Sequence, residues 1–298
     1  MNRTREGRTH RDRTPAVAGR FYPGEPDQLA LDVAALMGTS GTSWTSGAAG
    51  TSAPPGATGP EDRAVPASPA LGLLAPHAGY VYSGAVAGAT YARVVVPERA
   101  VVLCPNHTGL GARVALWPGG GWATPLGRVP IDPELTAALR ACPLVEDDRA
   151  AHLHEHALEV QLPFLMTRRP GVAIAALCLG PLSAGEALEL GRALAAAVRA
   201  HPALLVASSD MSHYVGAEEA REKDMLALGR LLALDARGLH DTVRREDISM
   251  CGFVPATVML AAALELSARE AVLVRYSNSG DVTGDRRSVV GYAGAIVR

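Results

Sequence analysis

From residue 71 to the end of the chain, short apolar runs alternate with longer stretches that carry apolar residues at helical spacing. This alternation restricts the fold more than any other feature, because runs that are apolar at consecutive positions fit strands covered on both faces. The expected strands are 71–75, 100–104, 172–180, 203–207, 271–277 and 289–297. The expected helices between them are 83–94, 132–141, 156–168, 183–200, 218–234 and 255–266. The pattern predicts an α/β fold with a central, largely parallel or mixed β-sheet flanked by helices on both faces.

The N-terminal part of the chain differs in composition from the rest. Residues 1–14 are basic and no apolar segment follows them, so we expect a disordered segment and not a secretory signal. Residues 38–69 consist mainly of Gly, Ser, Thr, Ala and Pro, a composition that predicts a flexible insertion. A helix is expected between these two segments, with apolar residues at helical spacing: Leu29, Val33 and Leu36. We therefore expect a single domain over residues 15–298.

The bulk composition excludes several classes of function. With 28 basic and 30 acidic residues, the formal net charge is -2, so no nucleic-acid partner is expected. The sequence has no run of 18 apolar residues, so no membrane span is expected either. Four widely spaced cysteines without a CxxC motif are typical of a reducing compartment. We therefore expect a cytoplasmic protein.

Imidazoles follow three of the expected strands. His77 and His107 follow the first two strands, and Asp210 and His213 follow the fourth. In open α/β sheets, ligands bind beyond the carboxyl ends of the strands. If these strands are neighbours, the three imidazoles meet in one crevice, and neutral imidazole is the commonest metal ligand. The pattern therefore indicates a metal or ligand site at this edge of the sheet.

Among the cysteines, Cys251 is the one that fits a functional role. It precedes Gly252 and an apolar helix, and a helix start lowers the pKa of a thiol, which suits a metal ligand or a reactive thiol. The other three are interpreted as small buried hydrophobic residues: Cys104, Cys142 and Cys178.

The stretch HLHEHALE carries three histidines and two glutamates. His152 and His154 are interpreted as capping and solvated groups at the start of a helix. His156 and Glu159 are candidates to face the pocket, and the role of Glu155 stays open.

Two other chemistries find no support in the sequence. A nucleophile at Ser208 or Ser209 is disfavoured because the segment lacks a GxSxG elbow. Neither a Walker loop nor a GxGxxG element is present for nucleotide chemistry.

A series of spaced motifs resembles the Memo-like family, also called AmmeMemoRadiSam system protein B. In order, the motifs are AGRFYPG, APHAGYVYSG, PNHTG, HALEVQLPFL, SSDMSHY, MCGFVPA and SGDVTGDRRSVVGYAGA. The resemblance covers nearly the whole chain apart from the basic N-terminus and the 38–69 insertion. It implies the fold of the class III extradiol dioxygenases, in which a central sheet flanked by helices has its pocket at the strand ends.

The same resemblance implies a set of metal ligands. The dioxygenases hold non-haem iron with two histidines and a glutamate, whereas Memo-like proteins have two histidines and a cysteine in the corresponding pocket. In this sequence the matching residues are His77 of PHAGY, His107 of PNHTG and Cys251 of MCG. Because a thiolate is softer than a carboxylate, this set favours copper or zinc over iron.

Further residues of these motifs are expected near the metal. Asp210 and His213 are expected to form a proton-handling pair, in which Asp210 fixes the tautomer of the imidazole. Tyr80, His156 and Ser209 are expected to contact a substrate.

These expectations describe a metal-dependent redox enzyme, an oxidoreductase that acts on an unknown small molecule or peptide. The alternative is a module that binds a phosphorylated or carboxylated ligand, such as a phosphopeptide, without turnover. The long name of the family also implies a radical-SAM protein and an AMMECR-type protein as partners.

Overall fold

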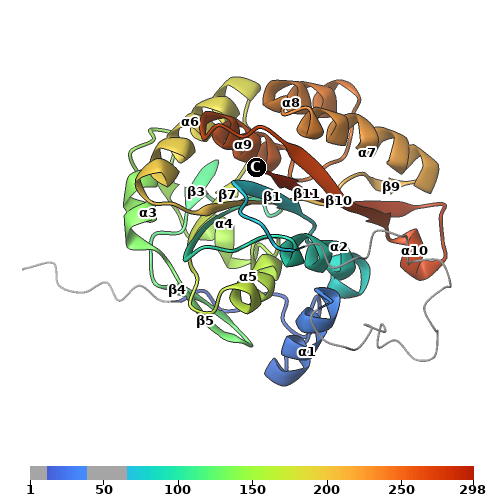
Figure 1. Ribbon diagram of the computed structural model, residues 1–298, viewed down its shortest axis with the longest axis horizontal. Coiled ribbons are helices and arrows are strands. Elements are labelled where there is room, and N and C mark those ends of the chain that lie inside the picture. Colours follow the sequence, from blue (N-terminus) through green and yellow to red (C-terminus); the bar gives the residue numbers. More distant parts are fainter. Residues whose placement is uncertain (1–11, 39–65) are drawn as a thin grey trace, which may run out of the picture.

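The computed structural model describes residues 12–38 and 66–298 (Figure 1). The segment 1–14 that is predicted to be disordered and the 38–69 insertion therefore lie mostly outside the described residues. The described structure begins at Asp12, and the next residue, Arg13, is already buried.

A nine-stranded mixed sheet forms the centre of the molecule (Figure 1). Eight strands lie side by side in the order β10 (Ala271–Asn278), β11 (Val289–Val297), β1 (Gly72–Ala75), β8 (Leu204–Ser208), β2 (Arg99–Pro105), β7 (Ala173–Leu179), β3 (Val114–Leu116) and β6 (Glu146–Asp147), and β9 (His213–Val215) pairs with β11. The four central strands β1, β8, β2 and β7 are parallel, whereas β11 and β3 join them antiparallel. A separate hairpin consists of β4 (Gly121–Thr124) and β5 (Gly127–Pro130). The predicted mixed sheet is confirmed, and each of the six predicted strands is present within one residue of its expected bounds.

The central strands are buried on both faces, as their continuous apolar sequences require. Along β8, Leu205 and Ala207 belong to the core on one face of the sheet, whereas Leu204 and Val206 belong to the core on the other. This alternation follows from the two-residue period of a strand.

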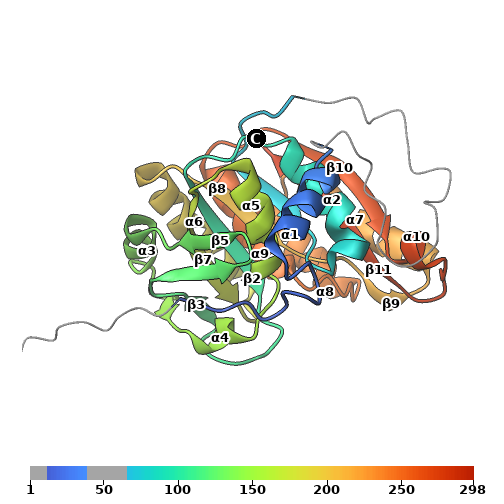
Figure 2. The same ribbon diagram turned by 90° about the horizontal axis from the view of Figure 1, so that it is seen from below.

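Helices cover both faces of the sheet, as Figures 1 and 2 show. One core contains residues of α3 (Pro133–Leu139), α6 (Ala184–Ala200), α7 (Ala217–Leu232), α8 (Ala236–Arg245) and α9 (Phe253–Glu265). The other contains residues of α1 (Pro26–Leu36), α2 (Tyr80–Ala92) and α5 (Leu162–Arg168). The short helices are α4 (Ala150–Leu153), the 3-10 turn η1 (Glu159–Gln161) and α10 (Gly280–Thr283). Within the described ranges, no helix has the length and apolar character needed to cross a membrane.

The predicted N-terminal helix is confirmed as α1, and its three predicted apolar residues are buried.

The prediction of a helix over 156–168 is wrong at its start, since α5 begins only at Leu162 after an irregular turn. At this turn the carboxylate of Glu155 accepts hydrogen bonds from the main-chain N–H groups of His156 and Ala157. Such local bonds between side chain and main chain compete with helix formation.

Candidate metal centre

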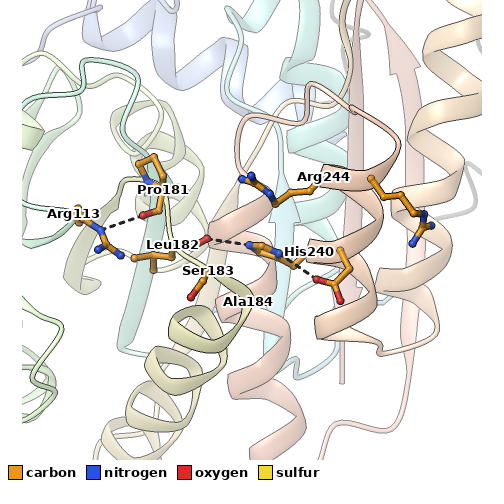
Figure 3. A pocket seen from close by; sticks show the side chains of 9 residues that line it. Arg113, Pro181, Leu182, Ser183, Ala184, His240 and Arg244 are labelled. Atoms are coloured by element: carbon orange, nitrogen blue, oxygen red, sulfur yellow. Dashed lines mark hydrogen bonds and ion pairs between the residues drawn. The ribbon is translucent and has the colours of Figure 1, made fainter.

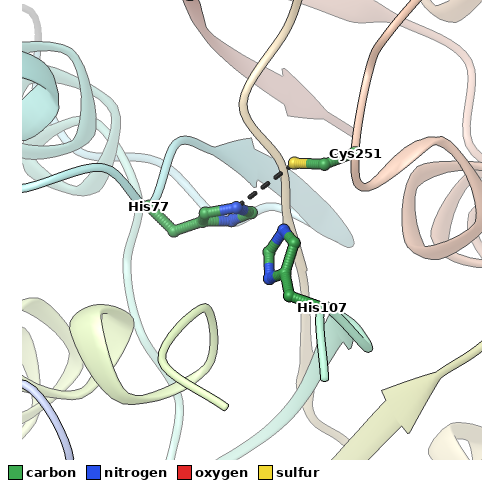
Figure 4. Close-up of side chains that lie close together, drawn as sticks. All are labelled: His77, His107 and Cys251. Carbon is green, nitrogen blue, oxygen red and sulfur yellow. Dashed lines mark hydrogen bonds between the residues drawn. The ribbon is translucent and has the colours of Figure 1, made fainter. Parts of the chain in front are cut away.

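Three candidate metal ligands meet beyond the carboxyl ends of β1 and β2, two parallel strands that flank β8 (Figure 4). His77 follows β1, His107 follows β2, and Cys251 lies on the turn before α9. Their donor atoms all lie within 4.8 Å of one another, and Cys251 Sγ is 3.2 Å from His77 Nε2. In a tetrahedral zinc site the donor atoms are about 3.3–3.6 Å apart, given bonds of about 2.0–2.3 Å. The three side chains therefore fit a single metal ion with small adjustments.

The tautomer of His77 is set by Ser208. The Ser208 hydroxyl donates its one proton to the carbonyl oxygen of Ala157 at 2.6 Å and accepts from Gln161 Nε2 at 2.8 Å. At 2.9 Å from His77 Nδ1 it accepts again, so Nδ1 carries the ring proton and Nε2 carries a lone pair. Burial lowers the pKa of His77 well below its ordinary value, which keeps the ring neutral. His77 thus presents a free Nε2 in the form that binds metals.

The tautomer of His107 is set by Glu155, whose role the sequence leaves open. The buried carboxylate of Glu155 accepts from the main-chain N of His107 at 2.7 Å and pairs with Nδ1 of the same ring at 3.0 Å. Burial disfavours the charged form of Glu155, but the hydrogen bond and charge of His107 outweigh it and lower the pKa of the carboxyl. The same bond raises the pKa of His107 against the effect of its burial. A carboxylate behind a ligand imidazole orients the ring and makes it a stronger ligand.

Replacement of Glu155 by glutamine is expected to weaken zinc binding by about 10–100-fold, the usual cost of losing such a partner. The amide keeps the size of the side chain but has one acceptor oxygen and no charge. Competition with a chromophoric chelator measures the affinity, and Glu146→Gln on the exposed strand β6 is the matched control. Unchanged affinity in a folded Glu155→Gln protein would show that the carboxylate does not support His107.

The thiol of Cys251 faces the free nitrogen of His77 across the 3.2 Å contact. The main-chain N–H of Asp210 donates to the sulfur at 3.3 Å. Burial, together with the charge of Asp210, raises the pKa of the thiol, so the predicted lowering by the helix start is wrong for the metal-free protein. The thiol proton lies where a metal ion would bind, and metal binding would release it. Glycine is required at position 252 because a Cβ there would lie 2.2 Å from the carbonyl oxygen of Ser208.

The predicted pairing of Asp210 with His213 is replaced by two separate arrangements. Asp210 Oδ1 accepts from the main-chain N of His77 at 2.7 Å, and burial raises the pKa of its carboxyl to about 6. His213 Nδ1 lies 2.9 Å from the carbonyl oxygen of Ser249, and its main-chain N donates to Ser249 Oγ at 2.7 Å. Because a carbonyl only accepts, Nδ1 of His213 is the protonated nitrogen. Ser249 therefore fixes the tautomer that the sequence assigned to Asp210.

Tyr80 and Ser209 are predicted to contact a substrate, but both hydroxyl groups are used inside the protein. The Tyr80 hydroxyl is buried and donates to the carbonyl oxygen of Val160 at 2.8 Å. Ser209 is fully buried, donates to the carbonyl oxygen of Asp210 at 2.7 Å and accepts from the main-chain N of Gly252 at 2.9 Å. Both residues hold the walls of the site in place.

His156, the third residue predicted to contact a substrate, adjoins the ligand imidazoles. Its ring centre is 5.4 Å from that of His77 and 4.9 Å from that of His107. Phe21, from the N-terminal segment, packs edge-on against it at 4.9 Å. His156, His107 and Glu155 form a second group whose donor atoms lie within 4.8 Å of one another. Phe21 belongs to the AGRFYPG motif, but nothing in the sequence places it beside His156, which is 135 residues away along the chain (156 − 21).

The remaining residues of the HLHEHALE stretch divide between the core and the surface. His154 is exposed, as expected. The expectation of a solvated His152 is wrong, because its ring is buried between Trp117 and Trp122. Glu159 is also buried, and its carboxylate pairs with Arg13. The prediction of three buried free cysteines is confirmed: Cys104, Cys142 and Cys178.

Comparisons with known proteins give a shared fold and a family for the chain. In solved structures, the chain is similar to an uncharacterized protein from Escherichia coli K12, with a TM-score of 0.54, 17% identity, and coverage of 76% of this chain and 98% of that one. This likeness shows a shared fold.

Sequence relatives are closer. A MEMO1 family protein of Aquifex aeolicus is 40% identical over 287 residues, which cover 96% of this chain and 99% of the relative. A MEMO1 family protein of Methanopyrus kandleri is 38% identical over 294 residues, which cover 96% and 99% of the two chains. The family described as Memo-like protein matches residues 13–296. The chain therefore belongs to the Memo-like protein family.

Proposed function

We propose that this protein is a metal-dependent oxidoreductase with a mononuclear centre held by His77, His107 and Cys251. The observation that supports this most strongly is that both imidazoles already have the tautomer that binds a metal through Nε2. Ser208 and Glu155 engage the two Nδ1 atoms, and both free Nε2 atoms lie near the sulfur of Cys251.

The donor set favours copper or zinc, because a thiolate is a soft ligand and the set carries no carboxylate. Three protein ligands leave at least one coordination position open, which is typical of catalytic and not of structural sites. When bound, a copper ion would supply one-electron redox chemistry, and a zinc ion would supply Lewis-acid chemistry. The proposed redox activity therefore depends on which of these metals the protein retains.

In this proposal His213 moves a proton. Its Nδ1 is held by the carbonyl of Ser249, so Nε2 carries the lone pair that accepts a proton. The ring is partly exposed, and its charge influences the pKa of both His77 and Asp210. Asp210 holds the main chain of His77 and the sulfur of Cys251 through its own side chain and N–H. We assign to Asp210 the positioning of the two ligands.

The proposal is tested by elemental analysis of protein purified without oxygen and loaded separately with Cu(I), Fe(II) and Zn(II). One equivalent of copper or zinc retained per chain after gel filtration is the expected result. Retention of iron alone would favour dioxygenase chemistry, and retention of no metal would refute the metal centre. Oxygen consumption by the copper-loaded protein with ascorbate then tests for turnover. Tight copper binding without oxygen consumption would favour a binding role without redox turnover.

A further inference from the structure

A second hollow lies beyond the carboxyl end of β7, at the same edge of the sheet as the candidate metal centre. Figure 3 shows the side chains that line it. Its volume is about 900 Å³, and it lies between the turn that joins β7 to α6, the helix α8, and the residue before β3. β7 pairs with β2, the strand that ends at the His107 turn, so the hollow follows the next strand end in the sheet. We call it the α6–α8 pocket. Its lining residues are Arg113, Pro181, Leu182, Ser183, Ala184, His240, Asp241, Arg244 and Arg245.

One face of α8 supplies the charged wall of this pocket. The α8 residues of the lining are His240, Asp241, Arg244 and Arg245. Pairs of them are three or four residues apart, the spacing that brings side chains together on one side of a helix. With Arg113 from the opposite wall, the lining has three guanidinium groups and one carboxylate. These guanidinium groups offer N–H donors to an anionic ligand, and the strength of that attraction depends on how far each group is already paired within the protein.

The three guanidinium groups are not equally engaged by the protein. Arg113 pairs with Glu186, and Arg245 pairs with Glu246. Arg244 forms no ion pair with any residue that the structure describes. Figure 3 shows its guanidinium extending from α8 toward the wall that contains Pro181. All five N–H donors of Arg244 are therefore available to a ligand.

His240 gives a second, independent indication of a polar ligand. The residue is 3% exposed, and its Nε2 donates to the carbonyl oxygen of Leu182 at 3.0 Å. In the neutral ring Nδ1 therefore carries a lone pair, and it has no hydrogen-bond partner among the described residues. Asp241 Oδ1 lies 3.6 Å from Nδ1, a contact that becomes an ion pair only when the ring is protonated. Buried polar atoms almost always have a partner. A ligand that offers an O–H group here would satisfy this nitrogen.

We propose that the α6–α8 pocket binds the phosphate group of a small organic phosphate monoester. Guanidinium groups recognise phosphate oxygens through paired, charge-assisted hydrogen bonds, which suits Arg244 with Arg113 opposite. The monoanion of a phosphate monoester, which predominates below its second pKa near 6, also carries a P–O–H donor that His240 Nδ1 can accept from. The volume exceeds that of a phosphate and leaves room for the organic part. The pocket shares no side chain with the metal donor set, so this site does not depend on metal binding.

Calorimetric titration of the full-length protein with inorganic phosphate tests the proposal. The titration is done with a chelator present and at constant ionic strength, so that failure of the metal centre does not affect the result. Arg244→Gln is expected to weaken phosphate binding about tenfold, as for the loss of a charged hydrogen-bond donor. Arg192→Gln is the matched control, because Arg192 is exposed on α6 and does not line the pocket.

Unchanged phosphate affinity in Arg192→Gln and weaker binding in Arg244→Gln would support the site. Equal affinities in the two variants, or no binding to the unmodified protein, would overturn it. Acetate is the second probe, with one negative charge and no P–O–H donor. Binding of acetate as tight as that of phosphate would overturn the assignment to phosphate monoesters.

Discussion

Replacement of Cys251 by serine is expected to lower the affinity for Cu(I) by about 100-fold or more, which corresponds to ~2.7 kcal/mol of binding free energy. The thiolate is the one anionic and soft donor in the set, and a serine hydroxyl is a poor ligand for a soft ion. The affinity for Zn(II), which also accepts oxygen ligands, should fall by a smaller factor. Anaerobic competition titration with a chromophoric chelator measures both affinities. The ratio of the two losses then reports directly on the role of the sulfur.

The matched control for this change is Cys142→Ser, which removes a buried thiol that lies in the core and outside the donor set. It should leave both metal affinities unchanged, although it lowers stability slightly. If Cys251→Ser binds Cu(I) as tightly as the unmodified protein, the metal is not held by the sulfur, and the assignment of the centre to these three residues is wrong.

The sheet could be predicted from the sequence because its central strands are buried on both faces. Such strands are apolar at every position, as in 172–180, and their bounds are visible without any knowledge of their neighbours. Helix α8 was not predicted, since its sequence ARGLHDTVRR is mostly polar and contains a glycine. Tertiary packing of Leu239 and Val243 against the core compensates for this weak local preference.

The two ligand histidines could be predicted from the sequence, but the side chains that fix the tautomers of their imidazole rings could not. His77 and His107 follow recognisable strands, and the ends of neighbouring parallel strands lie at one edge of the sheet. Ser208 lies 131 residues from His77 in the sequence, and Glu155 lies 48 residues from His107. Contacts over such separations leave no periodic signal in a single sequence. For the same reason the sequence predicts a pairing of Asp210 with His213, which are close in the chain, whereas the imidazole of His213 lies against the carbonyl oxygen of Ser249.

A second large effect is expected from Glu159→Ala, which should reduce the free energy of unfolding by ~3–5 kcal/mol. Glu159 and Arg13 form an ion pair that is completely buried, at the end of a segment expected to be disordered. The carboxylate also accepts from the main-chain N of Ala16 at 2.8 Å, from that of Val17 at 3.0 Å and from the hydroxyl of Tyr22 at 2.6 Å. Its removal leaves a buried guanidinium without its counter-charge and several donors without an acceptor. Equilibrium denaturation by urea measures the loss.

The effect should extend to the metal centre, because Arg13 donates to the carbonyl oxygens of both His152 and Glu155. Glu155 is the residue that fixes His107, so release of Arg13 should also weaken metal binding.

The surface variant Glu189→Ala on α6 is the control for Glu159→Ala, and it should change stability by less than about 0.5 kcal/mol. The double variant Arg13→Met/Glu159→Leu shows whether the loss of stability in Glu159→Ala comes from losing the Arg13–Glu159 attraction or from leaving the Arg13 guanidinium buried without a counter-charge. Because it removes both charges and fills their space with apolar atoms, it should be more stable than Glu159→Ala. If the double variant is the less stable of the two, the hydrogen bonds from Glu159 to the N-terminal segment outweigh the cost of burying its charge. A Glu159→Ala protein as stable as the control would show that the N-terminal segment adds nothing to the fold.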